Sequence, residues 1–521
     1  MGRHDGNETH LSTTEHPAQR LSRRLRPLKL LGAITDREIP VEVWITGGLI
    51  VLAAVIRIIV IDNQSFWWDE ALTAYEARAP FGSMVNTVLH VETTPPLYFV
   101  LIWVWAHLFG TGEIALRSVS ALAGVALVPI AYLSARELVS RQAGVLAAAF
   151  VALNPFTIWY SQEARSYMLL AALTGASFLW FVRARRYAAP RALAWWAIWS
   201  SLALMTHFFA GFAVAPEALW LLWVARTRLV AGAVAVVVIA QTAMLPFAGA
   251  DTTHGAGWIG RIPRIHRIAS AILEWGVSIV NRRATVTEGL AGGAILVLAV
   301  TLLLVLGGDE RRRTATKPAI AVAGFVLLAP LALGFLGQDY FLSRNLIPAF
   351  VPVATVVGAA CVVPRARVLG GGLAIALLAM FSVSAATVQT EPSLERPDWR
   401  AVAHAIGPAT VPRAILYAGG GYADPLKIYL PHVNWVQQPG QKVRIQELDL
   451  VGAPRWMPRV RTRAPAGTKR LAHVSTTGVI IERFALQRPI STSVTALVKR
   501  APHLFRRTPR GLLFFFQQPG A

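Results

Sequence analysis

The stretch EVWITGGLIVLAAVIRIIVI at residues 42–61 contains only two charged side chains, Glu42 and Arg57. About 20 predominantly apolar residues are enough to cross a bilayer as an α-helix. Apolar segments of similar length recur as far as residue 388, 55% of the 521 residues are hydrophobic, and only 15% are charged. A soluble globular protein carries about 25% charged residues. The sequence therefore predicts an all-α polytopic membrane protein.

About eleven transmembrane helices are expected. They lie near residues 42–61, 118–135, 142–160, 167–182, 193–209, 210–225, 229–248, 288–306, 319–337, 346–363 and 368–388. The preceding residues 1–41 are polar and rich in arginine, and they lack the short apolar core of a cleavable signal peptide. We therefore expect three parts: a cytoplasmic basic tail at 1–41, a transmembrane domain at 42–388 and a further domain at 389–521.

The basic residues set the expected orientation, because Lys and Arg prefer cytoplasmic loops. An N-terminus on the inner side places these basic segments in the cytoplasm: 136–141, 183–192, 226–228, 307–318 and 364–367. Much of the net charge of +22 therefore flanks predicted spans, and nucleic-acid binding is not needed to explain it.

The segment PLYFVLIWVWAHLF at residues 96–109 is apolar but too short for an ordinary span. If it crossed the membrane, all five later basic loops would face outward, against the charge bias. We therefore predict a helix that lies in the outer interface, where Trp and Tyr are common. This arrangement puts Asp69, Glu92 and Glu163 on the same, extracytoplasmic side.

Residues 389–521 carry no predicted span and are strongly basic. Eleven crossings leave this region outside the cell, as a small extracytoplasmic α/β domain of about 130 residues. Its charge would suit an acidic acceptor. The run LLFFF at 512–516 predicts either a final strand or an edge that touches the membrane.

Several other chemistries find no support in the sequence. The single cysteine, Cys361, excludes an internal disulfide. The chain has no GxxxxGK[ST] phosphate loop, no CxxC pair and no HExxH motif, so no metal site is indicated. A cofactor is not expected, although two neighbouring acids could hold a divalent cation.

The first outer loop opens with FWWDE, in which Asp69 and Glu70 follow two tryptophans at the mouth of a span. A carboxylate near hydrocarbon needs a polar cavity or a partner. One interpretation is a solvated acid beside an aromatic belt, and the other is a catalytic carboxylate in a water-filled cleft. Glu92 stands just before Pro95-Pro96, where a helix dipole also favours an acid.

The short outer turn WYSQEARSY contains Glu163 and Arg165. The two side chains could pair with each other, or Arg165 could hold a phosphate, for which a guanidinium is well suited. Arg344 begins another span at the outer side, and His207 ends one, where it is either a packed interfacial residue or a ligand contact. The segment 261–283 is either a basic platform for phosphate or lipid headgroups or a generic amphipathic segment.

Arg57 lies within the first predicted span. An intramembrane arginine is a candidate for function by default, although snorkelling toward the interface would also account for it.

The ordered motifs FWWDEALTAYEA, ETTPPLYF, the Arg117-Ser118 start of a span, WYSQEARSYM and FLSRNLIPAFVP resemble a known group. They are similar to bacterial relatives of protein O-mannosyltransferases and of the lipid A aminoarabinose transferase, which are membrane glycosyltransferases of the C-type (GT-C) fold, families 39 and 83. The resemblance covers residues 42–210 well and weakens after that. Many relatives have a histidine directly before the paired prolines, where this chain has Thr94.

The resemblance implies an inverting transfer of a sugar from a polyprenyl-phosphate donor to a cell-envelope acceptor, which could be a protein, a lipid or a polysaccharide. It implies that Asp69 is the catalytic base and that Glu92 orients the acceptor or acts as a second acid. Arg165 and Arg344 would contact the phosphate, and Glu163 would position Arg165. Glu70, His207 and Arg57 are further candidate substrate contacts. Mannose, arabinose, galactose and aminoarabinose remain open as the sugar.

Two other functions remain open from the sequence. A transporter or flippase of a lipid-linked or anionic substrate would also need intramembrane arginines and acids, but transporters favour midplane charges and internal repeats. A non-catalytic assembly protein could bind envelope polyanions through the basic domain at 389–521, in which case the acids would be dispensable.

Overall fold

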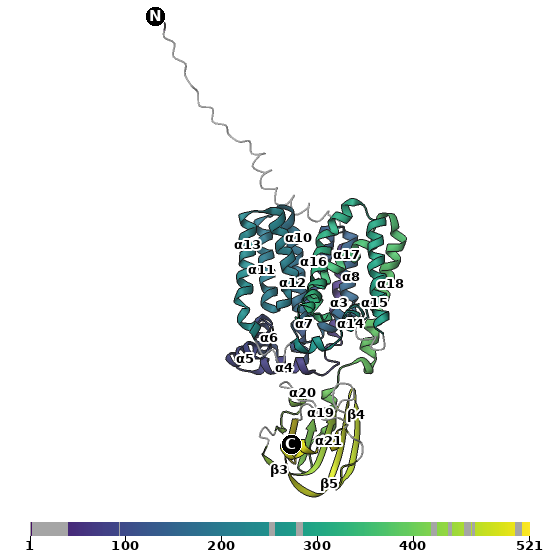
Figure 1. Ribbon diagram of the computed structural model, residues 1–521. Coiled ribbons are helices and arrows are strands. Elements are labelled where there is room, and N and C mark those ends of the chain that lie inside the picture. The colour runs from purple at the N-terminus through teal and green to yellow at the C-terminus, as the bar shows by residue number, and fades with distance from the viewer. Residues whose placement is uncertain are drawn as a thin grey trace, which may run out of the picture.

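The computed structural model describes residues 2, 40–92, 94–249, 256–277, 285–417, 425–435, 440–452, 460, 464–505 and 513–520. The arginines of the predicted basic tail, and Arg282 and Arg283 of the basic segment 261–283, lie outside the described residues. A bundle of helices carries a domain built on a β-sheet at one end (Figure 1).

The bundle is built from sixteen α-helices within its described residues. They are α3 (Val41–Ile58), α4 (Trp68–Arg78), α5 (Phe81–His90), α6 (Leu97–Phe109), α7 (Glu113–Leu138), α8 (Arg141–Leu153), α9 (Pro155–Ser161), α10 (Tyr167–Tyr187), α11 (Pro190–Thr206), α12 (Gly211–Ala225), α13 (Arg228–Ala243), α14 (Arg264–Val277), α15 (Val286–Leu302), α16 (Glu310–Phe335), α17 (Phe350–Cys361) and α18 (Arg367–Thr390). The short 3-10 helices η1 (Phe208–Ala210) and η6 (Ser343–Ala349) precede α12 and α17.

The number of spans differs from the predicted eleven. In the described residues, eight helices are long and apolar enough to cross a membrane, or nine if α8 and α9 form one bent span. Helices do occupy all eleven predicted positions, but α11 has 17 residues and α13 has 16, which is short for a full crossing. In the bundle α11 packs between α10 and α13 (Figure 1), and a crossing by α11 or α13 remains a prediction.

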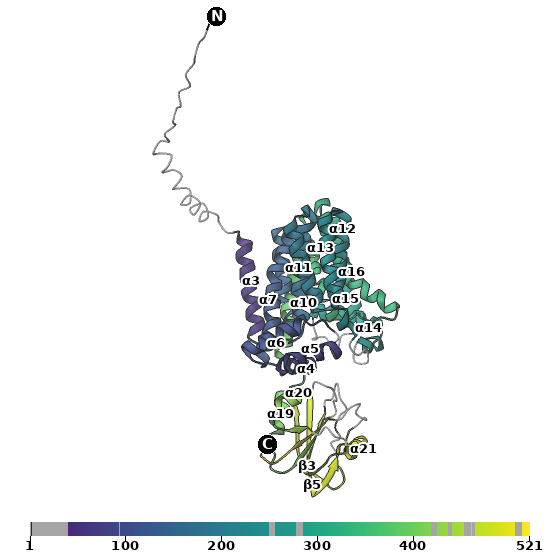
Figure 2. The same ribbon diagram turned by 90° about the vertical axis from the view of Figure 1, so that its left-hand side faces the viewer.

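The short helices α4, α5 and α6 lie together at the end of the bundle that faces the sheet domain (Figures 1 and 2). With 13 residues, α6 is too short to span a bilayer alone, and its position in the outer interface stays a prediction. It packs Tyr98, Phe99 and Ile102 into a buried cluster that also contains Phe66 of the first loop. The loop that carries the acids is therefore fixed against α6.

A bend between α8 and α9 places the turn that follows them. Asn154 accepts hydrogen bonds from the backbone N–H groups of Phe156 and Thr157, and Pro155 occupies the first helical position. Proline cannot continue the hydrogen bonds of α8, and the two helices meet at 55°. Gly124 of α7 is also required here, because a Cβ would lie 2.1 Å from the Ser161 Oγ.

The described residues of the C-terminal domain form a six-stranded mixed sheet of order β2-β6-β1-β3-β5-β4. Its strands are β1 (Arg413–Tyr417), β2 (Asn434–Trp435), β3 (Lys442–Gly452), β4 (Thr468–Thr476), β5 (Val479–Ser493) and β6 (Leu513–Gln517). Among these six strands in the described residues, only β1 and β3 pair in parallel. Helices α19 (Trp399–Ile406) and α20 (Pro425–Tyr429) pack on one face and α21 (Val494–Leu504) on the other. The run predicted as a strand or membrane edge is therefore an inner strand, β6.

Candidate active site

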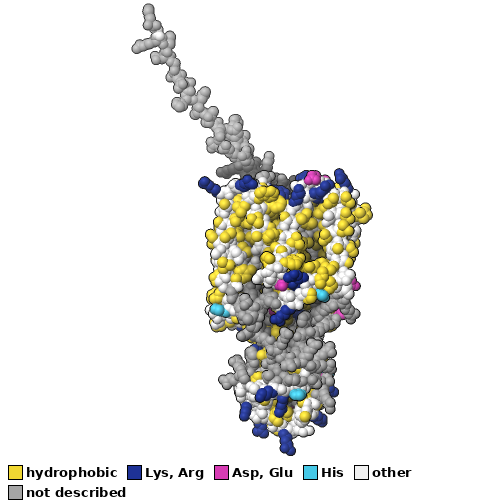
Figure 3. All heavy atoms as spheres, in the orientation of Figure 1, with side chains coloured by type: hydrophobic (Ala, Val, Ile, Leu, Met, Phe, Trp, Pro, Cys, Tyr) yellow, Lys and Arg dark blue, Asp and Glu magenta, His cyan; other side chains and the backbone are white. Residues whose placement is uncertain are grey.

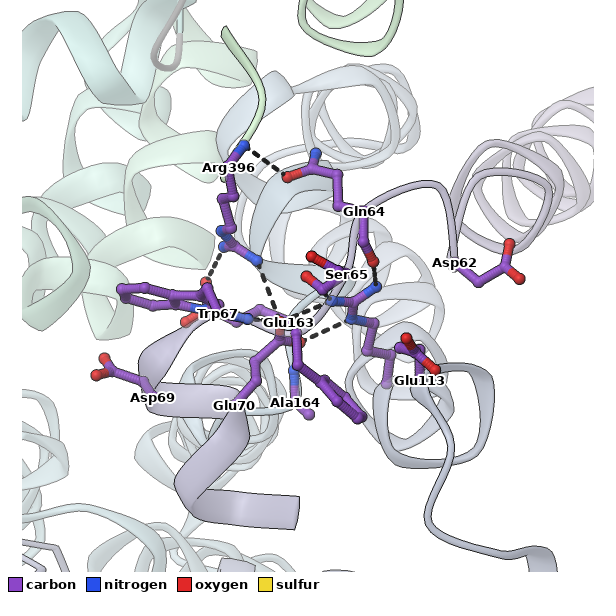
Figure 4. Close-up of polar contacts among 12 residues, drawn as sticks. Asp62, Gln64, Ser65, Trp67, Asp69, Glu70, Glu113, Glu163, Ala164 and Arg396 are labelled. Atoms are coloured by element: carbon purple, nitrogen blue, oxygen red, sulfur yellow. Dashed lines mark hydrogen bonds and ion pairs between the residues drawn. The ribbon is translucent and has the colours of Figure 1, made fainter. Parts of the chain in front are cut away.

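Most of the predicted acids and arginines meet where the bundle contacts the C-terminal domain. The site is built from the loop before α4, the first turn of α4, the end of α5, the turn between α9 and α10, the start of η6, and the linker after α18. Figure 4 shows the part of the site that contains Asp69, Glu70, Glu163 and Arg396. These segments are far apart in the sequence, and they converge because α4 packs on α6, α6 packs on α7, and α10 packs on η6.

Glu70 is fully buried and holds this end of the bundle together. Its two carboxylate oxygens accept hydrogen bonds from the Arg117 Nε and Nη2, both at 2.7 Å, and the Ala164 backbone N–H donates to it at 2.8 Å. Arg396 lies 3.5 Å away. Burial raises the pKa of Glu70, but the charge and hydrogen bonds of Arg117, the charge of Arg396 and the Ala164 N–H together outweigh it, and the net pKa lies below its usual value. Glu70 is therefore an ionised structural anchor, not an accessible substrate contact.

Glu92 and Arg165 form a second ion pair. The Arg165 Nη1 and Nη2 lie 3.1 and 3.4 Å from the two carboxylate oxygens of Glu92. Arg165 also donates to the backbone oxygen of Asp69 at 3.3 Å and to the Thr73 hydroxyl at 3.4 Å. Glu92 thus fixes the guanidinium directly beneath the first turn of α4.

A further acid that the motifs do not indicate, Glu76, is buried next to this pair. Neither of its carboxylate oxygens has a hydrogen-bond partner among the described residues. Burial raises the pKa of Glu76 well above its usual value, and the negative charge of Glu92 adds to the rise while Arg165 opposes it. Burial without a partner therefore favours the protonated form of Glu76.

Asp69 differs from these acids because its carboxylate stays open. The Asp69 side chain is 34% exposed, and it points away from the contacts that surround Glu70 (Figure 4). The Arg344 Nη1 lies 3.5 Å from its Oδ2. The guanidinium of Arg344 sits over the rings of Tyr167 and Trp258, and its buried Nε has no hydrogen-bond partner in the described part of the chain. The accessible carboxylate of Asp69 thus faces the guanidinium of Arg344, which still has an unpaired hydrogen-bond donor.

Glu163 pairs with Arg396 and not with Arg165, so the predicted positioning of Arg165 by Glu163 does not match the structure. The Arg396 Nη2 donates to the Glu163 Oε2 at 2.6 Å. Its guanidinium lies over two indole rings, 4.9 Å from the centre of Trp67 and 4.4 Å from that of Trp159. Burial raises the pKa of Glu163 despite the opposing charge of Arg396.

Arg57 is a structural clamp and not a substrate contact. It is fully buried, and its guanidinium donates to the carbonyls of Val151 and Ala152 and to the hydroxyls of Thr157 and Ser161 at 3.0–3.1 Å. The bend after α8 leaves these carbonyls without helical partners, and the arginine satisfies them.

His207 also has a structural position. Its Nδ1 accepts a hydrogen bond from the Phe209 backbone N–H at 3.2 Å, which caps η1. Its ring packs on Phe209 and Tyr167, and the residue is buried. These contacts favour the packed interfacial alternative, and a ligand contact of His207 stays a prediction.

Within the segment 261–283, Arg264 and Arg267 of α14 bind to residues at the end of α16 and just after it. The Arg267 Nη2 lies 2.8 Å from Asp339, and the Arg264 Nη2 donates to the Gly334 carbonyl. Farther along α14, Glu274 accepts a hydrogen bond from the Ser343 hydroxyl, next to Arg344. Arg264 and Arg267 therefore fasten α14 to the end of α16, while Glu274 supports the residue beside Arg344.

Four site residues were not assigned from the sequence: Glu76, Arg117, Glu274 and Arg396. Arg117 belongs to a quoted motif, and a charge at the start of a predicted span is expected to have a partner. Arg396 follows directly after the last predicted span, a weaker signal. In the described ranges, no group of three or more His, Cys, Asp or Glu side chains is arranged to hold a metal ion.

Residues 93–249 match the family model described as dolichyl-phosphate-mannose-protein mannosyltransferase. This match confirms the resemblance to polyprenyl-phosphate-sugar-dependent membrane glycosyltransferases that the motifs predict. No curated protein matches the sequence.

Among solved structures, the chain is similar to the oligosaccharyltransferase of Archaeoglobus fulgidus, with 14% identity, a TM-score of 0.38, and coverage of 69% of this chain and 54% of that one. It is similar to ArnT of Cupriavidus metallidurans at 14% identity, a TM-score of 0.38, and coverage of 84% and 97%. It is also similar to the S. cerevisiae Pmt1-Pmt2 complex at 18% identity, a TM-score of 0.31, and coverage of 42% and 34%. The chain spans about half the length of the archaeal enzyme.

Proposed function

We propose, from the premise that residues 93–249 match the dolichyl-phosphate-mannose-protein mannosyltransferase family, that this multi-pass membrane protein is a glycosyltransferase. It transfers a sugar from a polyprenyl-phosphate donor to a hydroxyl of a cell-envelope acceptor on the extracytoplasmic face. The single observation that supports this proposal best is the open Asp69 carboxylate opposite Arg344, 3.5 Å apart, in a cluster whose other paired acids are buried.

Asp69 is the proposed catalytic base. The acceptor hydroxyl loses its proton to the Asp69 carboxylate as its oxygen attacks the anomeric carbon of the donor sugar. The bond from that carbon to the phosphate oxygen breaks on the opposite face, so the configuration inverts. The electron pair leaves with the polyprenyl phosphate, whose negative charge grows during the step.

Arg344 and Arg165 are the proposed phosphate contacts. A preorganised cation stabilises a developing negative charge most strongly where water is scarce. Arg344 is three-quarters shielded, and its free Nε leaves it able to donate to a phosphate oxygen. Arg165 is held beneath Asp69 by Glu92. We therefore assign Glu92 a positioning role, which differs from the acceptor-orienting role that the resemblance implies.

The test compares two aspartate variants in membranes supplied with labelled polyprenyl-phosphate sugars, mannose and aminoarabinose among them. Label moving to an endogenous acceptor is the readout. Asp69→Asn is expected to reduce transfer by about 10²–10⁴-fold, the usual contribution of a general base. Asp62→Asn is the matched control, because Asp62 is exposed on the same loop and lies apart from the ion pairs (Figure 4).

Both variants should accumulate in membranes to the wild-type level. Normal transfer by Asp69→Asn would overturn the assignment of the base. Absence of transfer by the wild-type protein with every donor would overturn the proposed function as a whole.

A further inference from the structure

A second polar site lies at the opposite end of the bundle. α7 begins beside the C-terminal domain, since Tyr429 donates to Glu113 at 2.7 Å, and its 26 residues extend about 39 Å away from that contact. A cavity of about 700 Å³ lies there, between the last turns of α7 and α10 and the first turns of α16. Lys and Arg side chains gather along this rim of the molecule (Figure 3).

The lining of this cavity is strongly basic. Six arginines and two carboxylates contribute side chains to it in the described part of the chain. They are Arg136, Arg183, Arg185, Arg186, Arg311 and Arg312, with Glu137 and Asp309.

Both carboxylates, those of Glu137 and Asp309, already have partners within the protein. Glu137 forms an ion pair with Arg183 at 2.6 Å, and its backbone carbonyl accepts a hydrogen bond from Arg186. Asp309 accepts the Arg312 backbone N–H at 2.8 Å and so caps the first turn of α16. Neither acid neutralises the remaining cations of the cavity.

Of the six arginines, Arg183 alone forms an ion pair within the described ranges, and Arg186 and Arg312 donate to backbone carbonyls. The other three have neither an ion pair nor a side-chain hydrogen bond there: Arg136, Arg185 and Arg311. The Nε of Arg185 is also buried and has no hydrogen-bond partner there. Basic residues prefer cytoplasmic loops, and this preference explains the exposed arginines at this rim. It does not explain why the buried Nε of Arg185 has no partner beside the cavity, because buried donors are normally hydrogen-bonded.

We propose that this cavity binds a phosphate-bearing anion. Guanidinium groups match phosphate oxygens in bidentate, charge-assisted hydrogen bonds, and basic pockets between transmembrane helices accept phospholipid headgroups. The volume is large enough for a diphosphate or a glycerophosphate group, and the first backbone N–H groups of α16 add the positive end of a helix dipole. The anion is either an anionic phospholipid headgroup or a soluble polyphosphate.

The test uses the full-length protein purified in a neutral detergent. Native mass spectrometry measures binding of phosphatidylglycerol against phosphatidylcholine, and the midpoint of thermal unfolding is followed with sodium pyrophosphate. The variant Arg136→Gln/Arg185→Gln/Arg311→Gln is compared with Arg141→Gln/Arg365→Gln/Arg367→Gln. These control arginines are exposed at the same rim and do not line the cavity. The double variant Arg136→Gln/Arg311→Gln leaves the half-buried Arg185 in place, in case its loss impairs folding.

The wild-type protein should bind one of the two probes, and the cavity variants should weaken that binding by about tenfold or more while the control triple variant keeps it. A preference for phosphatidylglycerol identifies the lipid headgroup, and stabilisation by pyrophosphate identifies the soluble anion. The proposal is overturned if neither probe binds, or if cavity and control variants weaken binding equally.

Discussion

At the scale of single residues, two acids of the cluster have opposite pKa shifts although they lie less than two turns apart on α4. Glu70 and Glu76 are both in α4 and both buried, but only Glu70 has a bidentate arginine. Burying an unpaired carboxylate is costly, and the group takes up a proton instead. The raised pKa of Glu76 therefore implies a pH-dependent stability.

Proton linkage gives the direction in which Glu76 changes the free energy of unfolding with pH. Above the usual pKa of 4.5, the unfolded chain loses this proton while the folded protein keeps it, so the free energy of unfolding falls as pH rises. Glu76→Gln cannot ionise and should raise the midpoint of thermal unfolding at pH 8, with a smaller difference at pH 5. Glu310→Gln, which alters an exposed acid, is the control. Parallel pH profiles for the wild type and Glu76→Gln would contradict this prediction.

The sequence could indicate which residues gather, but not which of them remain accessible. Asp69, Glu92, Glu163 and Arg165 do come together, because each ends up at the same end of the bundle once the segment 96–109 is kept out of the membrane. Their partners could not be predicted, because Arg396 reaches Glu163 across 233 positions of the chain. The partners of Arg57 could not be predicted either, because they exist only where α8 ends in a bend.

At the scale of elements, the Arg117–Glu70 pair joins α7 to α4 and to the loop before it. Arg117 also donates to the carbonyls of Ile61, Gln64 and Ser65 at 2.6–3.1 Å. One side chain thus sets the path of the loop that leads from the first span to Asp69. The pair is buried, with both side chains at most 1% exposed.

Arg117→Gln is expected to destabilise the folded protein by about 3–5 kcal/mol, because it leaves a buried carboxylate without its main partner. Thermal or denaturant unfolding in detergent measures the loss. The exposed pair between Arg313 and Glu310 is the matched comparison, since Glu310→Gln should cost only about 0–1 kcal/mol. Equal losses of unfolding free energy for the two variants would show that the Arg117–Glu70 pair does not fasten α4 to α7.

The elements themselves were more predictable than their boundaries. Apolar periodicity and charge located a helix at every predicted span, yet α11 and α13 are too short to identify as full crossings by length. In the C-terminal domain, composition indicated a mixture of helix and strand. It could not give the parallel pairing of β1 with β3, which depends on contacts between residues more than 30 positions apart.

At the scale of the whole molecule, the acid cluster and the basic cavity lie at opposite ends of the bundle. The charge bias of the loops predicts that the acid end faces outward. The single cysteine is buried, so the native protein offers little reactive background to a thiol reagent.

Membrane-impermeant maleimide on intact cells should therefore label Lys469→Cys, an exposed site on β4 of the C-terminal domain. Arg365→Cys, exposed at the opposite rim, should react only after permeabilisation. The wild-type protein, with Cys361 alone, serves as the background. The reverse labelling pattern would place Asp69 on the cytoplasmic side and would refute the proposed face of transfer.

The position of Arg396 also has a consequence for biosynthesis. This residue follows α18, the last helix of the bundle, yet it supplies the cation for two acids that are translated far earlier, Glu70 and Glu163. A nascent chain would therefore insert its first helices with those two carboxylates still lacking that cation. The proposed catalytic centre would therefore be complete only after α18 and the linker that carries Arg396 had emerged from the ribosome. A chain that terminated before Arg396 would lack this cation.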